Sequence, residues 1–453
     1  MRLRRALRQG AAILCLSLAA TVASAETIAQ ALADAYNNSG LLAQNRAVLR
    51  AADEGVAQAN AALLPVINWS LDASSTASSQ VPGSDFSGSV SMSASLTIYD
   101  GGDNQLAIAQ QKEVVLGTRE ALRDVEQQVL FRAVQAYMSV RSTAEFISLR
   151  QNNLRVLNQE LRAARDRFDV GEVTRTDVAL AEASVASARS LLTAAEGDAR
   201  QAAAEFTAAV GRKPGNLEPV RPAPVTSGEA EAIALAQRNH PAVRQAQYAV
   251  SADELGIARA RTAYVPQARV TAQVGMDFEG NTGRSVGVSV GGPIYNGGAL
   301  PSVVRQAMAR RDQSRAGLHL ATVSVQQQVS NAFAALQVAR ASLQSTDEQV
   351  RAARVAFDGI REEATLGART TLDVLNAEQN LLNARANVIS AQEAEVNASY
   401  AVLQAMGLLT AEHLNLAVQQ YDPSAYYNLV KDAPAALSEQ GQALDRVLRA
   451  IGQ

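Results

Sequence analysis

Apolar residues recur every three or four positions over most of the chain, and this spacing is typical of amphipathic helices. The longest such stretch follows Asp100 and continues to about Val170. A second stretch, from Val178 to Ala195, steps alternately by three and four residues and has alanine at every second core position. Alanine lets helices approach closely, so the pattern predicts long, tightly packed coiled-coil helices.

The period changes to two in two parts of the chain. Residues 66–73 and 89–99 alternate apolar with small polar side chains, and residues 268–276 and 285–294 do the same. Strict alternation is typical of strands with one apolar face. Each pair of segments therefore predicts an amphipathic β-hairpin.

Such hairpins either cover a soluble core or face lipid. No other strand pattern lies nearby to build a soluble core, and strands of about 9–11 residues are long enough to cross a bilayer. We therefore expect membrane strands, with Trp69 and Tyr99 as candidates for the aromatic belt at the interface.

The two halves of the chain repeat each other. Before the hairpins the copies are separated by 201 positions, as for Pro65 and Pro266. From Tyr99 onward the separation is 196, and it pairs Asp177 with Asp373. A constant offset over so long a stretch indicates an internal duplication. Each copy predicts a helix, a β-hairpin, a very long helix, a tight turn and another long helix.

These features divide the chain into four parts. We expect a signal peptide at residues 1–25, a first structural repeat at 26–221, a second repeat at 222–420 and a C-terminal tail at 421–453. The tail contains the sequence YDPSAYY and ends in a short amphipathic helix at about 435–451. The expected hairpins lie at about 66–99 and 267–295, and the helix turns at about 169–177 and 365–373.

The N-terminus has the three parts of a secretory signal. Four arginines precede an apolar run, and Ala23-Ser24-Ala25 forms a cleavage site before Glu26. The single cysteine, Cys15, lies in the part removed, so the mature chain would have no disulfide and no thiol chemistry. Leu14 is too large for a lipoprotein cleavage site, so we expect no lipid anchor. Loss of the four arginines takes the formal net charge from −3 to −7, which argues against a nucleic-acid-binding protein.

The predicted strands do not suffice to close a barrel. After the signal no run of about 18 apolar residues predicts a transmembrane helix. Four strands leave open edges, which lipid does not tolerate, and barrels start at about eight strands. At least two chains must therefore share one barrel. A dimer would leave almost no lumen, whereas a trimer would give twelve strands.

The two helix turns carry a matching motif. Residues 168–180 read FDVGEVTRTDVAL, and residues 364–376 read ATLGARTTLDVLN. Glycine suits a helix C-cap, and Thr or Asp suits the N-cap of the next helix. The local sequence favours ordinary caps. A functional role for Asp177 and Asp373, whose carboxylates lie near helix N-termini, depends on the rest of the chain.

The whole mature chain resembles the TolC family of outer-membrane channel-tunnel proteins. The resemblance rests on LTIYDGG and GGPIYNGG after the hairpins, RFDVGEVTRTDV at the first turn and LGARTTLDVLNAEQNLLNAR at the second. It implies a mixed fold with mostly α structure and a small transmembrane β part, in which three chains form a twelve-stranded outer-membrane β-barrel and an α-helical coiled-coil tunnel through the periplasm. It also implies a periplasmic adaptor (membrane fusion protein) and an inner-membrane ABC or RND transporter as partners.

The resemblance also implies a gate at the helix turns, closed by hydrogen bonds and ion pairs. The gate residues of the family match Asp177, Arg369 and Asp373, and Thr176 lies beside the first of them. A second aspartate of the entrance falls at Asn376, and a gate tyrosine falls at Ala364, so the ring of anions would be single and one contact would be missing. Three copies of Asp373 around a narrow axis would favour cations.

Two other classes of protein compete with an export duct. An enzyme is disfavoured because His240, His319 and His413 lack metal-ligand spacing and no catalytic triad or phosphate loop is present, so we expect no cofactor and no metal. A periplasmic coiled-coil adaptor or structural protein without a pore would explain the helices but not two matched hairpins. Within the duct hypothesis, type I protein secretion and small-molecule efflux both stay open. The tail resembles that of family members that serve type I secretion.

Overall fold

The computed structural model describes residues 26–77, 84–225, 227–434 and 438–450. The predicted signal peptide lies outside these residues. The chain divides into two compact units. Unit 1 comprises the residues up to Asn38, Arg132–Ala223 and Ala339–Asn397, and unit 2 comprises Ser39–Phe131, Pro224–Val338 and the chain from Ala398.

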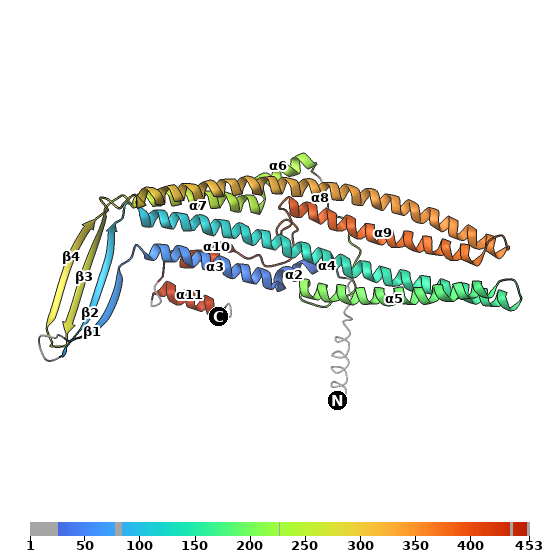
Figure 1. Cartoon of the computed structure of the whole chain (residues 1–453), viewed down its shortest axis with the longest axis horizontal. Coiled ribbons are helices and arrows are strands. Elements are labelled where there is room, and N and C mark those ends of the chain that lie inside the picture. The colour runs from blue at the N-terminus through green and yellow to red at the C-terminus, as the bar shows by residue number, and fades with distance from the viewer. Residues whose placement is uncertain (1–25, 78–83, 226, 435–437, 451–453) are drawn as a thin grey trace, which may run out of the picture. The chain divides into compact units, whose positions relative to one another are not determined.

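The described part of unit 2 contains one antiparallel sheet in the order β1-β2-β3-β4, which joins the two predicted hairpins (Figure 1). Three of the strands are longer than the alternation predicted, and β4 has the predicted length but lies three residues earlier in the chain. It ends before Pro293, which has no N–H to donate to a ladder, so the predicted extension to Ile294 is wrong. The strands are β1 (Val66–Ala77), β2 (Ser84–Tyr99), β3 (Gln267–Asp277) and β4 (Thr282–Gly291).

The strand register gathers the apolar side chains on one face of the sheet. Ile67 pairs with Ala94, Ala94 with Ala272, and Ala272 with Val286. The opposite face is polar, and the hydroxyls of Ser70 and Ser91 lie 2.8 Å apart. The described residues leave the apolar face uncovered, because 76% of Trp69, 66% of Val288 and 80% of Val286 stay exposed. A face of this kind requires a non-aqueous neighbour.

A pair of glycines joins each hairpin to the long helix that follows. Gly101 and Gly102 have φ of 68° and 88°, and Gly297 and Gly298 have φ of 65° and 86°, a region that favours glycine. Asp100 caps the first of these helices, because its two carboxylate oxygens accept the N–H groups of Gly102 and Asn104 at 2.8 Å. This geometry explains the repeated Tyr-Asp/Asn-Gly-Gly motif.

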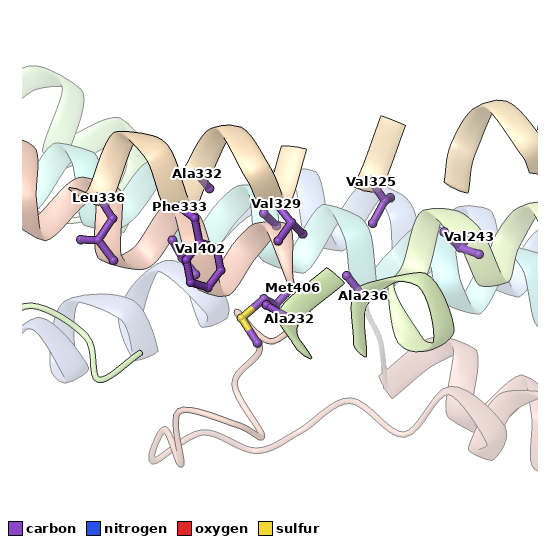
Figure 2. Close-up of a cluster of buried hydrophobic side chains, with 11 residues drawn as sticks. Ala232, Ala236, Val243, Val325, Val329, Ala332, Phe333, Leu336, Val402 and Met406 are labelled. Carbon is purple, nitrogen blue, oxygen red and sulfur yellow. The ribbon is translucent and has the colours of Figure 1, made fainter. Parts of the chain in front are cut away.

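Two helices of 67 residues each, α4 (Asp103–Asp169) and α8 (Ala299–Thr365), begin in unit 2 and end in unit 1. They confirm the predicted long helix of each repeat. The other helices in the described part of unit 2 are α3 (Gly40–Ala61), α6 (Glu229–Asn239), α7 (Pro241–Thr262), α10 (Pro423–Val430) and α11 (Glu439–Ala450), together with the end of α9 (Thr371–Ala405). In unit 2, apolar residues of α6, α7 and α8 and of the end of α9 form a buried cluster that includes Val329, Phe333 and Val402 (Figure 2).

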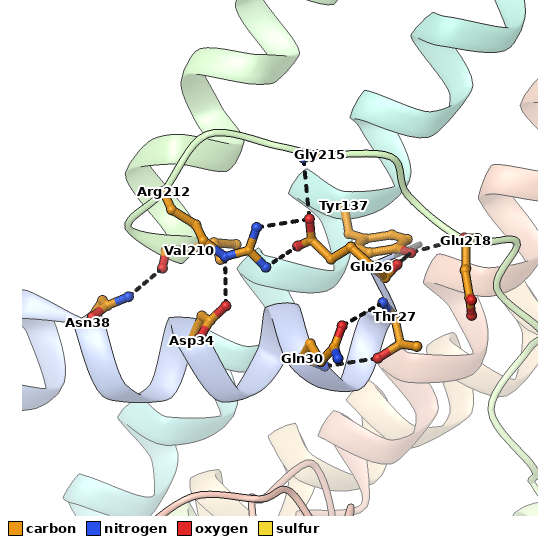
Figure 3. Close-up of polar contacts among 10 residues, drawn as sticks. All are labelled: Glu26, Thr27, Gln30, Asp34, Asn38, Tyr137, Val210, Arg212, Gly215 and Glu218. Carbon is orange, nitrogen blue, oxygen red and sulfur yellow. Dashed lines mark hydrogen bonds and ion pairs between the residues drawn. The ribbon is translucent and has the colours of Figure 1, made fainter. Parts of the chain in front are cut away.

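In unit 1 the first described residues contact residues 212–218, which follow α5 (Arg175–Val210) (Figure 3). Arg212 donates to both carboxylate oxygens of Glu26 and, through Nε, to Asp34 at 2.7 Å. The Tyr137 hydroxyl donates to the Glu26 carbonyl oxygen at 2.7 Å, and burial raises the pKa of Tyr137 to about 12. These contacts attach α2 (Ile28–Asn38) to the end of α5 (Arg175–Val210).

The other helices in the described part of unit 1 form two helical hairpins. Leu161 of α4 packs with Val185 of α5, and Phe357 of α8 packs with Val374 of α9. Leu375 of α9 joins the first of these clusters, so the two hairpins pack together, and their turns lie at the same end of the unit (Figure 1). Within the described residues, no helix combines the length and the apolar character needed to cross a membrane.

Candidate functional site

The two helix turns in unit 1 end their first helices in the same way. At the end of α4, the N–H groups of Gly171 and Glu172 donate to the carbonyls of Phe168 and Arg167 at 3.0 and 2.8 Å. This is a Schellman motif, and Gly171 has the φ of 82° that the motif requires. Gly367 occupies the same position after α8, with φ of 80°. Both glycines are therefore required by the backbone conformation.

Each turn then starts its second helix with a capping box. Oδ2 of Asp177 accepts the backbone N–H of Thr174 at 2.9 Å, and the Thr174 hydroxyl accepts the N–H of Asp177 at 3.3 Å. The second turn repeats both bonds between Thr370 and Asp373, at 3.0 and 3.2 Å. Each pair therefore satisfies two backbone donors that a helix start leaves without partners.

The caps also fix the charge of the two aspartates. The hydrogen bonds from Thr174 and Thr370 lower the pKa values of Asp177 and Asp373 below the ordinary value. Both carboxylates are therefore ionised at neutral pH. None of the hydrogen bonds among the described residues uses Oδ1 of either side chain, so each carboxylate keeps an acceptor for a further partner.

Arg369 lies in the second turn and pairs with Glu363, the residue six positions before it. Their Nε and Oε2 atoms are 2.8 Å apart, and both side chains are about half exposed. This partner raises the pKa of Arg369, with a smaller contribution from Asp373. Arg369, Asp373 and Asn376 line one groove of about 470 Å³ between α8 and α9.

The structure brings the predicted gate residues together only in part. Arg369, Asp373 and Asn376 share the second turn, whereas Thr176 and Asp177 lie in the first turn. Among the residues that the structure describes, no hydrogen bond or ion pair joins the two turns. A pairing of Arg369 with Asp177 would have to form with another copy of the chain or after a rearrangement.

Ala364, the position at which the resemblance implied a gate tyrosine, is a core residue. Ala364 is buried and packs with Phe357, Val374 and Ala377 between α8 and α9. Its small side chain therefore contributes to the hairpin core and makes no polar contact.

Sequence reasoning missed three polar contacts. Two of them join the two hairpins, and the third lies at the second turn. Asn153 of α4 donates to Oε1 of Glu378 of α9 at 3.0 Å, and Glu378 is buried. Burial raises the pKa of Glu378. Arg361 of α8 pairs with Glu160 of α4 at 3.3 Å. The available signal was the position of Glu378, which follows Val374 by four residues and therefore lies on the apolar face of α9. The third contact is the pair of Arg369 with Glu363.

No group of histidine, cysteine or acidic side chains within the described ranges is arranged to hold a metal ion. The polar groups at the turns include carboxylates, arginines, threonine hydroxyls and the amide of Asn376, which can form ion pairs and hydrogen bonds.

A sequence model of the family described as outer membrane efflux protein matches residues 17–212 and 232–408 of the chain. The outer membrane efflux protein BepC of Brucella suis is 38% identical over 428 residues, which cover 92% of each protein. The outer membrane protein TolC of Escherichia coli is 25% identical and covers 81% of this chain and 79% of TolC. The alkaline protease secretion protein AprF of Pseudomonas aeruginosa is 24% identical over 58% of each chain.

Solved structures show the same fold. The CmeC outer membrane channel of Campylobacter jejuni superposes with a TM-score of 0.75 at 16% identity, and the match covers 90% of each chain. The long duplicated helices and the four-stranded sheet are therefore shared with proteins of very different sequence. The resemblance to TolC that the turn and hairpin motifs indicated is confirmed, and the chain belongs to the outer membrane efflux protein family, whose members are export channels of the outer membrane.

Proposed function

We propose that three copies of the chain form a duct that crosses the outer membrane and extends through the periplasm, and that the two helix turns form its gate. The four-stranded sheet is the observation that carries this proposal. Its strands β1 and β4 are edges within the described chain, and its apolar face is exposed. Pairing β4 of one copy with β1 of the next would remove the edges, and three copies give the twelve strands of a barrel with a lumen.

The polar face of the sheet would line the lumen. It carries small side chains and polar groups such as Ser70, Ser91 and Gln273, which suit a water-filled channel. The apolar face, with Trp69 and Val288, would contact lipid. We propose further that residues 1–25 are removed as a signal peptide during export.

The gate would consist of Thr176, Asp177, Arg369, Asp373 and Asn376. The exposed Arg369 has one partner, Glu363, in its own turn, and Asp177 retains a carboxylate oxygen for a second partner. Between neighbouring copies, Arg369 and Asp177 would form ion pairs that close the entrance. Pairs between exposed groups contribute about 0–1 kcal/mol each, so such a gate would be easily opened.

A periplasmic adaptor would bind the end of unit 1, and an inner-membrane ABC or RND transporter would supply the substrate. Each turn exposes one apolar residue beside its glycine, Val170 with 71% and Leu366 with 81% of the residue surface accessible. Apolar residues exposed at matched positions favour a protein partner at this end. The groove lined by Arg369 and Asp373 offers a second contact.

Only the names of the relatives give information about the substrate class. AprF is a secretion protein for an alkaline protease, and BepC is an efflux protein. We favour type I protein secretion or small-molecule efflux without choosing between them, because a passive duct needs no specific binding site.

Outer-membrane fractionation and the mass of the purified complex test the proposal against a coiled-coil protein without a pore. The duct requires a complex of three chains in the outer-membrane fraction, which separates into single chains after heating. A chain that fractionates with the soluble periplasm, or that has the mass of one or two copies in mild detergent, would exclude the duct.

A further inference from the structure

The segment Tyr421–Val430, called here the C-terminal strap, lies against α3 in unit 2. Tyr426 and Val430 are buried against Ala57 of α3. The Tyr426 hydroxyl donates to Oε1 of Glu54 at 2.6 Å. The strap is therefore held by both apolar and polar contacts.

Two further tyrosines of the strap contact arginines. The ring centroid of Tyr421 lies 5.1 Å from the guanidinium carbon of Arg46 on α3. The ring centroid of Tyr427 lies 5.5 Å from that of Arg119 on α4. Both distances are within the range of cation–π attraction.

The buried carboxylate of Asp53 lies beside these contacts. Asp53 of α3 is completely buried, and neither of its oxygens has a hydrogen-bond partner among the described residues. Nε of Arg119 is also buried without a partner. A buried carboxylate without a hydrogen bond is costly in its ionised form, and burial raises the pKa of Asp53 to about 6.

In the second repeat the residues at the same two positions are exposed to solvent. Asp53 corresponds to Glu254 at the separation of 201, and Arg119 corresponds to Arg315 at the separation of 196. Arg315 and Glu254 form a direct ion pair at 2.8 Å, with 54% and 49% of their side chains exposed. The ion pair that the duplication would have given the first repeat is absent under the strap.

We propose that the C-terminal strap is a reversible cover that competes with an ion pair between Arg119 and Asp53. In the docked state, Arg119 lies under Tyr427 and Asp53 is buried. In the released state, Arg119 turns to Asp53 and forms the pair that Arg315 and Glu254 form in the second repeat.

A proton on Asp53 favours the docked state, because burying the neutral carboxyl group without a partner costs much less free energy than burying the carboxylate. The other groups that face Asp53 are Arg119 of α4, which lowers its pKa, and Glu54 of α3, which raises it. Further charged or titratable groups near the strap are Arg46 and Arg50 of α3, and Tyr421, Asp422, Tyr426 and Tyr427 of the strap itself.

The direction of the pH effect follows from the raised pKa. A carboxyl group that holds its proton more tightly in the docked state stabilises docking at low pH, and this stabilisation is lost as the pH rises through about 6. With a released pKa at the ordinary 3.8, docking should be about fourfold more favourable at pH 5.5 than at pH 7.5.

Hydrogen–deuterium exchange of the purified full-length protein tests this cover. After correction for the intrinsic pH dependence of exchange, peptides within 421–434 should exchange about fourfold more slowly at pH 5.5 than at pH 7.5. Asp53→Asn should give slow exchange at both pH values. Glu254→Gln, the matched change in the second repeat, should retain the wild-type pH dependence.

Two results would overturn the proposal. One is equal protection of the wild-type strap at both pH values, and the other is a pH dependence that survives Asp53→Asn. Tyr427→Leu provides a second variant in case Asp53→Asn fails to fold. It should speed exchange of the strap at both pH values, and unchanged exchange would also contradict the cover.

Discussion

The two aspartates that we propose for the gate also have a structural role. Asp177 and Asp373 each complete a capping box, and the hydrogen bonds from Thr174 and Thr370 lower their pKa values. A lowered pKa gives stability that is fully present above the ordinary pKa and is lost only as the pH falls through the lowered value. The caps therefore keep both carboxylates charged over the whole physiological pH range. Each aspartate can cap its helix and also form the ion pair that we propose for the gate.

Removing one partner of the cap should loosen the first turn. Thr174→Ala deletes the acceptor for the Asp177 N–H, and the loss of an N-cap hydroxyl typically costs about 1 kcal/mol. We expect about fivefold faster amide exchange in peptides at 171–180. Thr176→Ala, two positions away and outside the cap, is the control. Equal effects of the two changes would show that the capping box does not stabilise the turn.

The buried pair of Asn153 and Glu378 makes a second prediction at this scale. Asn153→Ala leaves the buried Glu378 oxygen without its donor, and such a loss costs about 1–3 kcal/mol. Glu378→Gln keeps an acceptor and removes the ionised form. Because burial raises the pKa of Glu378, the wild type gains stability as the pH falls through this raised pKa.

Thermal dissociation of the complex at two pH values measures both effects. We expect Asn153→Ala to lower the midpoint at pH 7.5 and Glu378→Gln to leave it equal or higher. Glu378→Gln should also weaken the dependence of the midpoint on pH. A stable Asn153→Ala variant together with an unstable Glu378→Gln variant would contradict this account.

At the scale of elements, the alternation of side chains predicted the hairpins, and the glycine-aspartate motif predicted both turns. These features depend on local periodicity and turn chemistry, which a sequence displays directly. The contacts of Arg212 with Glu26, of Tyr426 with Glu54 and of Arg369 with Glu363 were not predicted. They join separate residues through single side chains, and no period marks them. Pro293 was available as a signal for the end of β4. The prediction extended the strand past this proline because the apolar alternation continues to Ile294.

The two faces of the sheet give a prediction for one strand. Val288→Arg places a charge on the apolar face, which costs about 2–4 kcal/mol at the middle of a bilayer. Ser285→Arg, also in β4, places the same charge on the polar face, opposite Gln273. We expect Val288→Arg to reduce the amount of assembled protein in the outer membrane and Ser285→Arg to leave it near wild type. Equal amounts for both variants would mean that the apolar face does not meet lipid.

At the scale of the whole molecule, duplication explains why one chain carries two hairpins and two turns. Each repeat supplies two strands and one helical hairpin, and the family assignment makes the assembled chain an export channel. The two copies differ in their polar contacts. Among the described residues, only the second turn contains an arginine paired with an acidic side chain, and in the first repeat the buried carboxylate of Asp53 lies beside the C-terminal strap.

Single-channel conductance in a planar bilayer tests the gated duct most directly. The purified wild-type complex should show a low conductance that rises several-fold in the double variant Asp177→Ala/Arg369→Ala, because the pairs that narrow the entrance are removed. Arg165→Ala, which breaks the exposed pair with Glu182 outside the turns, should match the wild type. A correctly assembled complex without conductance would contradict the duct, and a high conductance shared by all three proteins would contradict the gate.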